Sequence, residues 1–183
     1  MKEAFKIIVV LTVICLICAF FLSFVFSVAK EKIEMNAKRA IEEGISKLAP
    51  CAKRVEEIKL KDEVVYKLFD EQDNSVGYAF LAQGQGYQGK IKILAVVDSS
   101  LEKLEGIEVV ESVETPGLGA RITEALFMEQ FKKLTVIPKI EYVKEEVEKD
   151  NQIMAITGAT VTSKAVVNIL NKRIEELREE LKG

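Results

Sequence analysis

Residues 157–163 read TGATVTS, and this stretch joins a short apolar run at 153–156 to a long amphipathic pattern at 163–181. The apolar run predicts a strand, and the later pattern, with apolar residues at helical spacing, predicts the last helix. The stretch between them combines two small residues with three hydroxyl residues, which suit a tight turn and a helix cap. It therefore predicts a strand-to-helix turn.

This turn has two interpretations. The first free N–H groups and the dipole of the helix favour a phosphate close to Thr160. Gly158 and Ala159 leave the Thr160 hydroxyl uncrowded, and Thr162 or Ser163 would cap the helix. The other interpretation is an ordinary, well-capped turn with no ligand. The local sequence does not separate the two.

Upstream of this turn, strand-like runs follow one another without a helix between them. A turn at 70–74 and a Gly-rich loop at 84–89 separate them, while helices are predicted at 31–48, continuing from the preceding apolar run, and at 123–134. Strands in the middle and helices towards both ends predict an α+β fold with one antiparallel sheet, not alternating βαβ units. The predicted strands before 153 are 64–69, 76–82, 91–97 and 104–110.

Residues 84–90 read GQGYQGK, which fits both G-x-G-x-x-G and most of a P-loop. Both motifs need a helix after the loop, so that its amino terminus meets the phosphates. Here 91–97 predicts a strand, and Ile91 stands where a P-loop needs a hydroxyl. We therefore expect no Rossmann or P-loop nucleotide site. We expect a wide hairpin whose glycines let another group approach the backbone closely, with a plain flexible hairpin as the alternative.

Residues 114–120 read ETPGLGA. In a four-residue turn that begins at Thr115, Pro116 would take the second position and Gly117 the third, which predicts a type II turn. Gly119, just after this turn, leaves the backbone without a side chain. Taken alone, this segment indicates only a tight turn.

Residues 7–29 form a 23-residue run without charge, Pro or Gly. As a helix it would be about 34 Å long, enough to cross a hydrocarbon core of roughly 30 Å. The run is too long for a signal-peptide core and no small-residue cleavage site follows, which favours an uncleaved anchor. A six-residue tail with two Lys is usually kept inside. This predicts a cytoplasmic tail at 1–6, a transmembrane helix at 7–29 and an extracytoplasmic domain at 30–183.

Composition narrows the function classes. The net charge of −3 gives no sign of nucleic-acid binding. The chain has no His, which argues against a metal enzyme or a Ser-His-Asp hydrolase. Cys15 and Cys18 fall inside the apolar run and Cys51 is alone beyond it, so a disulfide framework is excluded.

The three segments together, in this order and behind one span, resemble the FMN-binding domain family. This family includes the G subunit of the Rnf electron transport complex and the C subunit of the Na+-translocating NADH:quinone reductase. The ETPGLGA form and the compact length are more similar to the Rnf member. The resemblance implies that FMN is joined to Thr160 by a phosphoester, which a separate flavin transferase makes from FAD. The family motif usually carries Asp three positions before Thr157, where this chain has Met154.

The resemblance also implies the arrangement of the site. The hydroxyls near Thr160, backbone amides and Lys164 would contact the phosphate, and Tyr87 and residues 116–118 would flank the isoalloxazine. No catalytic residue is expected, because an electron relay abstracts no proton from a substrate. No metal ligand is expected, since the chain has no His. The expected cofactor-binding residues are Thr157, Gly158, Ala159, Thr162, Ser163, Lys164, Glu114, Thr115, Pro116, Gly117, Leu118, Gly86 and Tyr87.

The function that this resemblance implies is electron transfer within a membrane-bound, ion-translocating oxidoreductase of the Rnf type, from ferredoxin towards NAD+. The anchor would lie in the cytoplasmic (inner) membrane and hold the flavin near the other subunits, which raises its effective concentration. Two alternatives stay open: a stand-alone anchored flavoprotein that passes electrons to extracellular acceptors, and a ligand-binding or structural domain that is never flavinylated.

Overall fold

The computed structural model describes residues 2–60 and 63–182. It divides into two units, Met1–Ile41 and Glu42–Gly183. The first unit is the amino-terminal part of helix α1 (Lys2–Leu48), so the predicted continuation of the apolar run into a helix at 31–48 is confirmed. Within the described chain, α1 alone has the length and composition to cross a membrane. Its most apolar 18-residue window has a mean hydropathy of 3.1 and is not buried.

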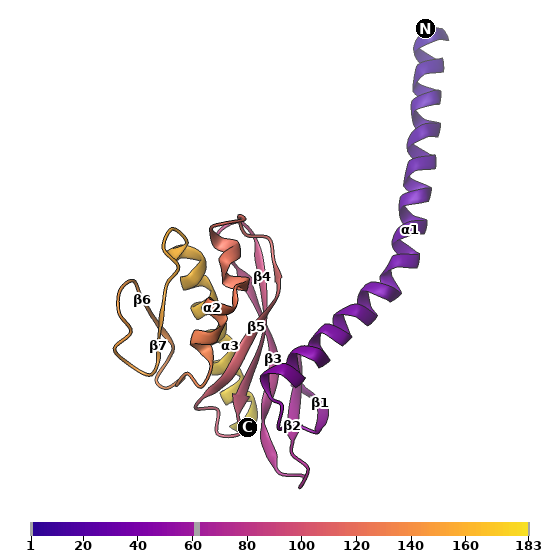
Figure 1. Cartoon of the computed structure of the whole chain (residues 1–183). Coiled ribbons are helices and arrows are strands. Elements are labelled where there is room, and N and C mark those ends of the chain that lie inside the picture. The colour runs from indigo at the N-terminus through magenta and orange to yellow at the C-terminus, as the bar shows by residue number, and fades with distance from the viewer. Residues whose placement is uncertain (1, 61–62, 183) are drawn as a thin grey trace. The chain divides into compact units, whose positions relative to one another are not determined.

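The second unit is built on a five-stranded antiparallel sheet in which each strand pairs with the next along the chain (Figure 1). Short connections between successive strands give this meander. The antiparallel α+β fold and the strands predicted between 64 and 110 are confirmed. The strands are β1 (Arg54–Leu60), β2 (Glu63–Phe69), β3 (Ser75–Gln85), β4 (Lys90–Asp98) and β5 (Leu104–Ser112).

The edge strand β1 was not predicted. Its sequence, RVEEIKL, is largely exposed and carries four charged side chains, so it shows no run of apolar residues. Such charges are typical of an edge strand, where they discourage pairing with another chain. β1 is held by its register with β2, from Arg54 opposite Phe69 to Leu60 opposite Glu63.

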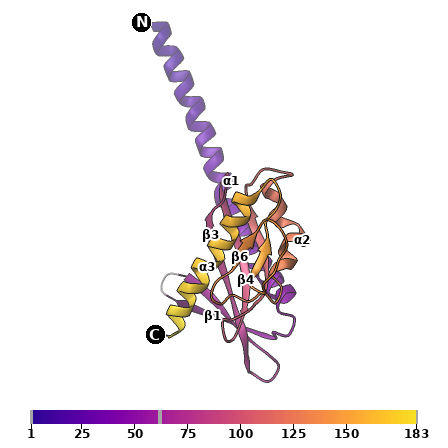
Figure 2. The same ribbon diagram turned by 90° about the vertical axis from the view of Figure 1, so that its left-hand side faces the viewer.

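Strand β4 is buried on both faces of the sheet. Ile91, Ile93 and their alternate neighbours belong to the main core, which α3 (Thr160–Lys182) covers (Figure 2). Leu94 lies on the opposite face, where the end of α1 packs: a Cβ on Gly44 would lie 2.5 Å from Leu94 Cδ2. Burial on both faces explains why this strand reads as a continuous apolar run.

The helix predicted at 123–134 is wrong in its extent. The structure has a 3-10 turn, η1 (Gly119–Thr123), then one turn of α-helix, α2 (Ala125–Met128), and a second 3-10 turn, η2 (Glu129–Phe131). Glu124 is extended, with ψ 143°, and separates the first two. The helical spacing came from Phe127 and Phe131, whose buried rings meet edge to face at 5.4 Å.

A separate parallel pair of short strands lies between η2 and α3. β7 (Gln152–Met154) is the strand predicted at 153–156, and β6 (Glu141–Val143) is its partner, which was not predicted. Gln130 fixes the other edge of β7: its side-chain amide accepts from Met154 N at 2.7 Å and donates to Met154 O at 3.3 Å. The Met154 side chain is left exposed.

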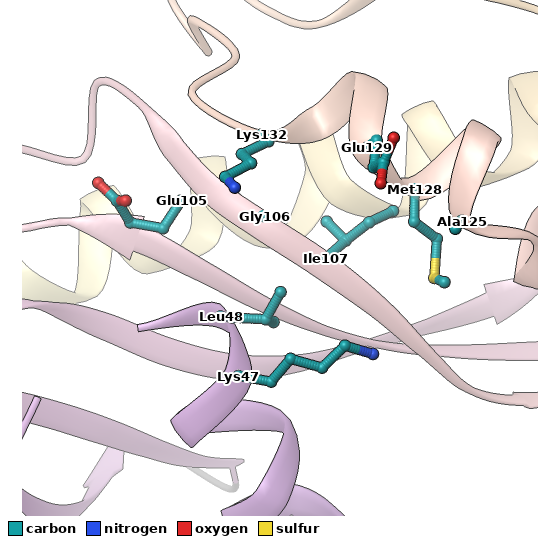
Figure 3. A pocket seen from close by; sticks show the side chains of 9 residues that line it. All are labelled: Lys47, Leu48, Glu105, Gly106, Ile107, Ala125, Met128, Glu129 and Lys132. Carbon is teal, nitrogen blue, oxygen red and sulfur yellow. The ribbon is translucent and has the colours of Figure 1, made fainter. Parts of the chain in front are cut away.

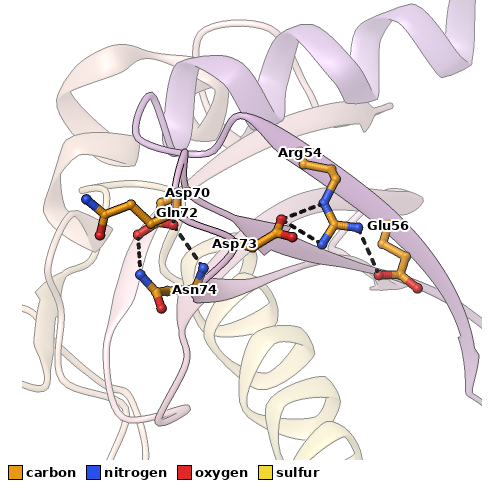
Figure 4. A network of polar contacts seen from close by, with 6 residues as sticks. All are labelled: Arg54, Glu56, Asp70, Gln72, Asp73 and Asn74. Atoms are coloured by element: carbon orange, nitrogen blue, oxygen red, sulfur yellow. Dashed lines mark hydrogen bonds and ion pairs between the residues drawn. The ribbon is translucent and has the colours of Figure 1, made fainter.

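The predicted turn at 70–74 joins β2 to β3 and is organised by one carboxylate (Figure 4). Asp70 Oδ1 accepts from the backbone N–H groups of Gln72 and Asn74, at 2.8 and 2.9 Å. Asn74 Nδ2 donates to Asp70 Oδ2 at 3.1 Å. Beside the turn, Arg54 pairs with Asp73 at 3.0 Å. These polar contacts hold the turn between the two strands.

Candidate functional site

The segment TGATVTS folds into the start of α3, but its hydroxyls do not cap the helix as predicted. α3 begins at Thr160, so Thr162 and Ser163 already lie in its first turn. Ser163 is fully buried; its Oγ accepts from Ile156 N at 3.0 Å and donates to Ala159 O at 3.1 Å. This hydroxyl ties the end of the preceding segment to the start of the helix.

The first backbone N–H groups of α3, beside Thr160, have no acceptor within the helix. The first bond of the helix runs from Ser163 N to Ala159 O at 3.0 Å. The N–H groups of residues 160–162 therefore have no carbonyl four positions earlier within the helix. Thr160 is half-buried and Val161 is exposed. With the partial positive charge of a helix amino terminus, this end of α3 can hold an anion.

A buried carboxylate connects the three sequence motifs. Glu114 is 6% exposed and follows β5. Its Oε2 accepts from the Thr162 hydroxyl at 2.7 Å, and its Oε1 accepts from Gln88 N at 2.9 Å. The hairpin between β3 and β4, the ETPGLGA loop and the first turn of α3 therefore meet at this side chain.

Two glycines make room for this carboxylate. A Cβ on Gly86 would lie 2.4 Å from Glu114 Oε1, and one on Gly119 would lie 2.3 Å from Glu114 Oε2. Neither distance is sterically possible without movement. The close approach predicted for the hairpin glycines is confirmed at Gly86, and the group that approaches is a side chain of the same chain. The strand predicted after the hairpin is also confirmed as β4.

The type II turn predicted in ETPGLGA is confirmed. Leu118 N donates to Thr115 O at 3.2 Å, and Gly117 between them has φ +75°. A positive φ at the third turn position is what this turn type requires. The turn directs Leu118 towards Gly158, because a Cβ on Gly158 would lie 3.5 Å from Leu118 Cδ2.

These segments enclose a pocket of about 380 Å³. Sequence reasoning missed two of its residues, Gly119 and Val161, although both lie inside the quoted motifs. Eight of the expected site residues line the pocket: Tyr87, Glu114, Thr115, Leu118, Gly158, Ala159, Thr160 and Thr162.

The other expected residues lie around the pocket without lining it. Thr157, Pro116, Gly117 and Lys164 are exposed, Ser163 is buried behind the first turn of α3, and Gly86 lies against the Glu114 carboxylate.

A second pocket, of about 230 Å³, lies between the end of α1, β5 and the α2–η2 segment (Figure 3). Leu48, Ile107 and Met128 give it an apolar lining, with Lys and Glu side chains around it. It contains no residue of the three motifs. The pocket at the start of α3 is therefore the candidate site.

Comparisons with known proteins agree with this choice. The family model of the FMN-binding domain matches residues 86–175, which include all the segments that meet at Glu114. The chain is 30% identical over 182 residues to the G subunit of the ion-translocating oxidoreductase complex of Methanosarcina acetivorans, covering 95% of this chain and 94% of that protein. This chain belongs to the family of FMN-binding G subunits.

A second member of this family is the G subunit of the Na(+)-translocating ferredoxin:NAD(+) oxidoreductase complex of Acetobacterium woodii. It is 32% identical over 191 residues, covering 95% of this chain and 91% of that protein. The fold is shared with the solved C subunit of the Na(+)-translocating NADH-quinone reductase from Parabacteroides distasonis. That structure has a TM-score of 0.58 and 21% identity, and the match covers 72% of this chain and 79% of that one.

The pocket of this family member fits a flavin nucleotide. Its volume is within the range of roughly 300–1,000 Å³ that is usual for small-molecule sites. Tyr87 and Leu118 offer an aromatic and an apolar side chain for a ring system, and the start of α3 offers N–H groups for a phosphate. Glu114 restricts where the flavin phosphate can lie, because its carboxylate would repel a phosphate. The phosphate therefore fits on the side of Thr160 and Val161.

Proposed function

We propose that this chain is the membrane-anchored electron-relay subunit of an Rnf-type complex, and that FMN in the pocket at the start of α3 carries the electrons. The observation that carries this proposal is the meeting of all three motifs around one pocket that Thr160 lines. When bound, a flavin supplies one- and two-electron chemistry. The protein's own residues hold it, orient it and limit its exposure, and no residue needs to act as a general acid or base.

The covalent attachment point is Thr160. Among the hydroxyl residues of 157–163, Thr162 donates to Glu114 and Ser163 bonds to the backbone around it, so both are occupied. Thr157 is exposed and does not line the pocket. Thr160 lines the pocket at the amino terminus of α3, and its hydroxyl has no hydrogen bond within the described residues. It can therefore form a phosphoester without breaking a contact of the fold.

The remaining contacts follow from this placement. Backbone N–H groups of the first turn of α3 hold the phosphate oxygens, and Lys164, exposed on the next turn, is its counter-ion. Thr162 contributes its backbone N–H group, since its hydroxyl is engaged by Glu114. Ser163, whose N–H group and hydroxyl are both bonded within the fold, supports the first turn of α3 from behind. Tyr87 and the 116–118 turn flank the isoalloxazine.

The proposed setting is the cytoplasmic membrane. Residues 1–6 form a cytoplasmic tail, 7–29 span the bilayer and 30–183 form the extracytoplasmic domain. The partners are the other membrane and soluble subunits of the complex, and a flavin transferase that uses FAD during maturation. Electrons pass from ferredoxin towards NAD+ through this relay.

The test is to express the full chain together with a flavin transferase and to look for flavin fluorescence in a denaturing gel. We expect a fluorescent band from the wild type and from Thr160→Ser, and none from Thr160→Ala. Thr157→Ala is the matched control and should remain fluorescent. Fluorescence that survives Thr160→Ala would contradict the attachment point.

Met154 requires a further arm in the same experiment. It stands where the family motif usually has Asp, and its side chain is exposed six residues before Thr160, accessible to a transferase. Met154→Asp should give a band at least as fluorescent as the wild type. If wild type and Met154→Asp both lack fluorescence with an active transferase, the chain is not a covalent flavoprotein.

A further inference from the structure

We propose that Glu114 is a positioning residue that assembles the flavin pocket before any flavin is attached, an inference that rests on the proposed function. Its carboxylate binds the hairpin tip with one oxygen and the first turn of α3 with the other. The residues that it joins are far apart in the sequence, 26 positions in one direction and 48 in the other.

The hairpin tip needs such a contact because the sheet does not reach it. The last pair between β3 and β4 is Gln85 opposite Lys90. Beyond that pair, Gly86 N donates to Gly89 O at 2.7 Å and closes the turn on itself. The bond from Gln88 N to Glu114 is the hydrogen bond that ties this turn to the ETPGLGA loop. It thereby sets the position of Tyr87, the neighbouring residue, which lines the pocket.

The carboxylate is held on the inner side of the pocket wall. A buried carboxylate is costly unless its oxygens accept hydrogen bonds, and bonds to a charged acceptor are stronger than neutral ones. Gly86 and Gly119 lack the Cβ atoms that would occupy the space of its two oxygens. The two loops are thus shaped around this side chain, and it closes the space between them.

Glu114 also determines which threonine hydroxyl is free to bond to the flavin phosphate. Because Thr162 donates its proton to Glu114, it cannot donate to a phosphate, and its oxygen is turned inward. Thr160, two residues earlier, also lines the pocket, and its hydroxyl has no hydrogen bond within the described residues. The carboxylate therefore orients the helix turn so that Thr160 and not Thr162 faces the ligand. Because the pocket is already formed, little of the free energy of flavin binding is lost to ordering its loops.

The assembly is tested without flavin, by hydrogen exchange on the full-length Thr160→Ala protein in detergent. In that background, Glu114→Ala should make the Gln88 amide exchange about tenfold faster or more, while the β4 amides stay protected. Glu114→Gln should restore protection, because its amide oxygen accepts from Gln88 N and its nitrogen donates to Thr162. Glu111→Ala, an exposed carboxylate three residues earlier, is the matched control.

Thr162→Val provides a second route if Glu114→Ala fails to fold, since it replaces only the hydroxyl with a methyl group of similar size. We expect faster exchange in the first turn of α3, and recovery in Thr162→Ser. Unchanged exchange at Gln88 in a folded Glu114→Ala protein, or unchanged exchange of the α3 turn in Thr162→Val, would overturn the proposal. Neither measurement requires flavin, so a failure of FMN attachment is distinguished from a failure of this assembly.

The flavinylated protein gives a readout that a purely structural role would not change. A negative charge in the pocket wall disfavours adding electrons to a nearby flavin. Glu114→Gln keeps the contacts and removes the charge, so it should retain FMN and raise the midpoint potential, while Glu111→Gln leaves the potential unchanged. A Glu114→Gln protein with the wild-type potential would show that this carboxylate does not face the flavin, and would overturn its assignment to the pocket wall.

Discussion

Two neighbouring glycines of the ETPGLGA loop serve different physical purposes. Gly117 has φ +75°, and a Cβ there would meet nothing within 4 Å. Gly119 is limited by space instead, since a Cβ there would meet Glu114 and lie 2.8 Å from Thr162 Oγ1. One position needs the conformational freedom of glycine, and the other needs its small size.

These two requirements predict different responses to substitution. Gly117→Ala should cost about 1–2 kcal/mol of unfolding free energy through backbone strain, and Gly117→Asn less, since Asn enters the left-handed region more readily. Gly119→Ala should cost roughly 1–3 kcal/mol by overpacking, and Gly119→Asn more. Chemical denaturation of the purified full chain measures both pairs. If Asn is better tolerated than Ala at Gly119, the steric account of that position is wrong.

The sequence predicted which residues lie around the candidate pocket more completely than it predicted the contacts that hold the pocket together. The motifs were sufficient to place Thr160, Tyr87 and Leu118 around one pocket. The role of Glu114 was not foreseen, because its bond to Thr162 joins residues 48 positions apart and depends on the tertiary fold. The capping role of Ser163 was predicted wrongly, since the same hydroxyl that suits a cap also suits a bond to the preceding segment.

At the scale of secondary structure elements, the stability of the turn between β2 and β3 depends on the protonation state of Asp70. The hydrogen bonds from Asn74, first from its backbone and then from its side chain, hold the pKa of the Asp70 carboxyl below its ordinary value, and the backbone of Gln72 adds to this. These donors bind the ionised form. The carboxylate therefore stabilises the hairpin while it is charged.

A pH titration of stability tests this turn. Because the pKa of Asp70 is lower in the folded state than in the unfolded chain, its contribution is fully present above the unfolded pKa of about 3.9. It is lost as the pH falls through the folded pKa. The difference in unfolding free energy between wild type and Asp70→Asn should thus be constant near neutral pH and shrink below about pH 4. Glu111→Gln, an exposed strand carboxylate, serves as the control; a difference that grows on acidification would refute the account.

Strands and helices could be predicted where one face, or the whole element, is buried and apolar. They were harder to predict where contacts with distant parts of the chain determine the conformation. β2 to β5 follow from apolar runs separated by polar turns. β1 was missed because four of its seven side chains are charged and interrupt the apolar pattern. The helix at 123–134 was predicted too long because Phe127 and Phe131 lie at helical spacing. The apolar run at 153–156 predicted β7, but its parallel partner β6 could not be predicted, since a three-residue strand gives too little periodicity.

For the whole molecule, we propose a membrane anchor followed by an extracytoplasmic flavin domain. Cys51 is exposed in the second unit, while Cys15 and Cys18 lie in the apolar part of α1. Cys15 and Cys18 are first replaced by Ala. A membrane-impermeant maleimide should then label Cys51 from the outside of cells whose outer layers have been removed and whose cytoplasmic membrane is intact. Cys51→Ser controls for background. Labelling only in inverted membrane vesicles would place the domain in the cytoplasm.

The anchor itself is tested by fractionation of the same cells. We expect the full chain to stay in the membrane after an alkaline wash, which strips peripheral proteins. Amino-terminal sequencing should find the protein beginning before residue 7. A mature protein that begins near residue 30 would show that the apolar run is cleaved and not an anchor.

The central claim is that one FMN is bound through a phosphoester to Thr160, and peptide mass spectrometry of the wild-type chain tests it most directly. The full chain is co-expressed with the flavin transferase, digested, and the peptide containing residues 157–163 is fragmented. We predict that this peptide carries the added mass of one FMN and that the fragments place it on Thr160. The added mass on Thr157, Thr162 or Ser163, or an unmodified peptide from both the wild type and Met154→Asp in the presence of an active transferase, would contradict the account.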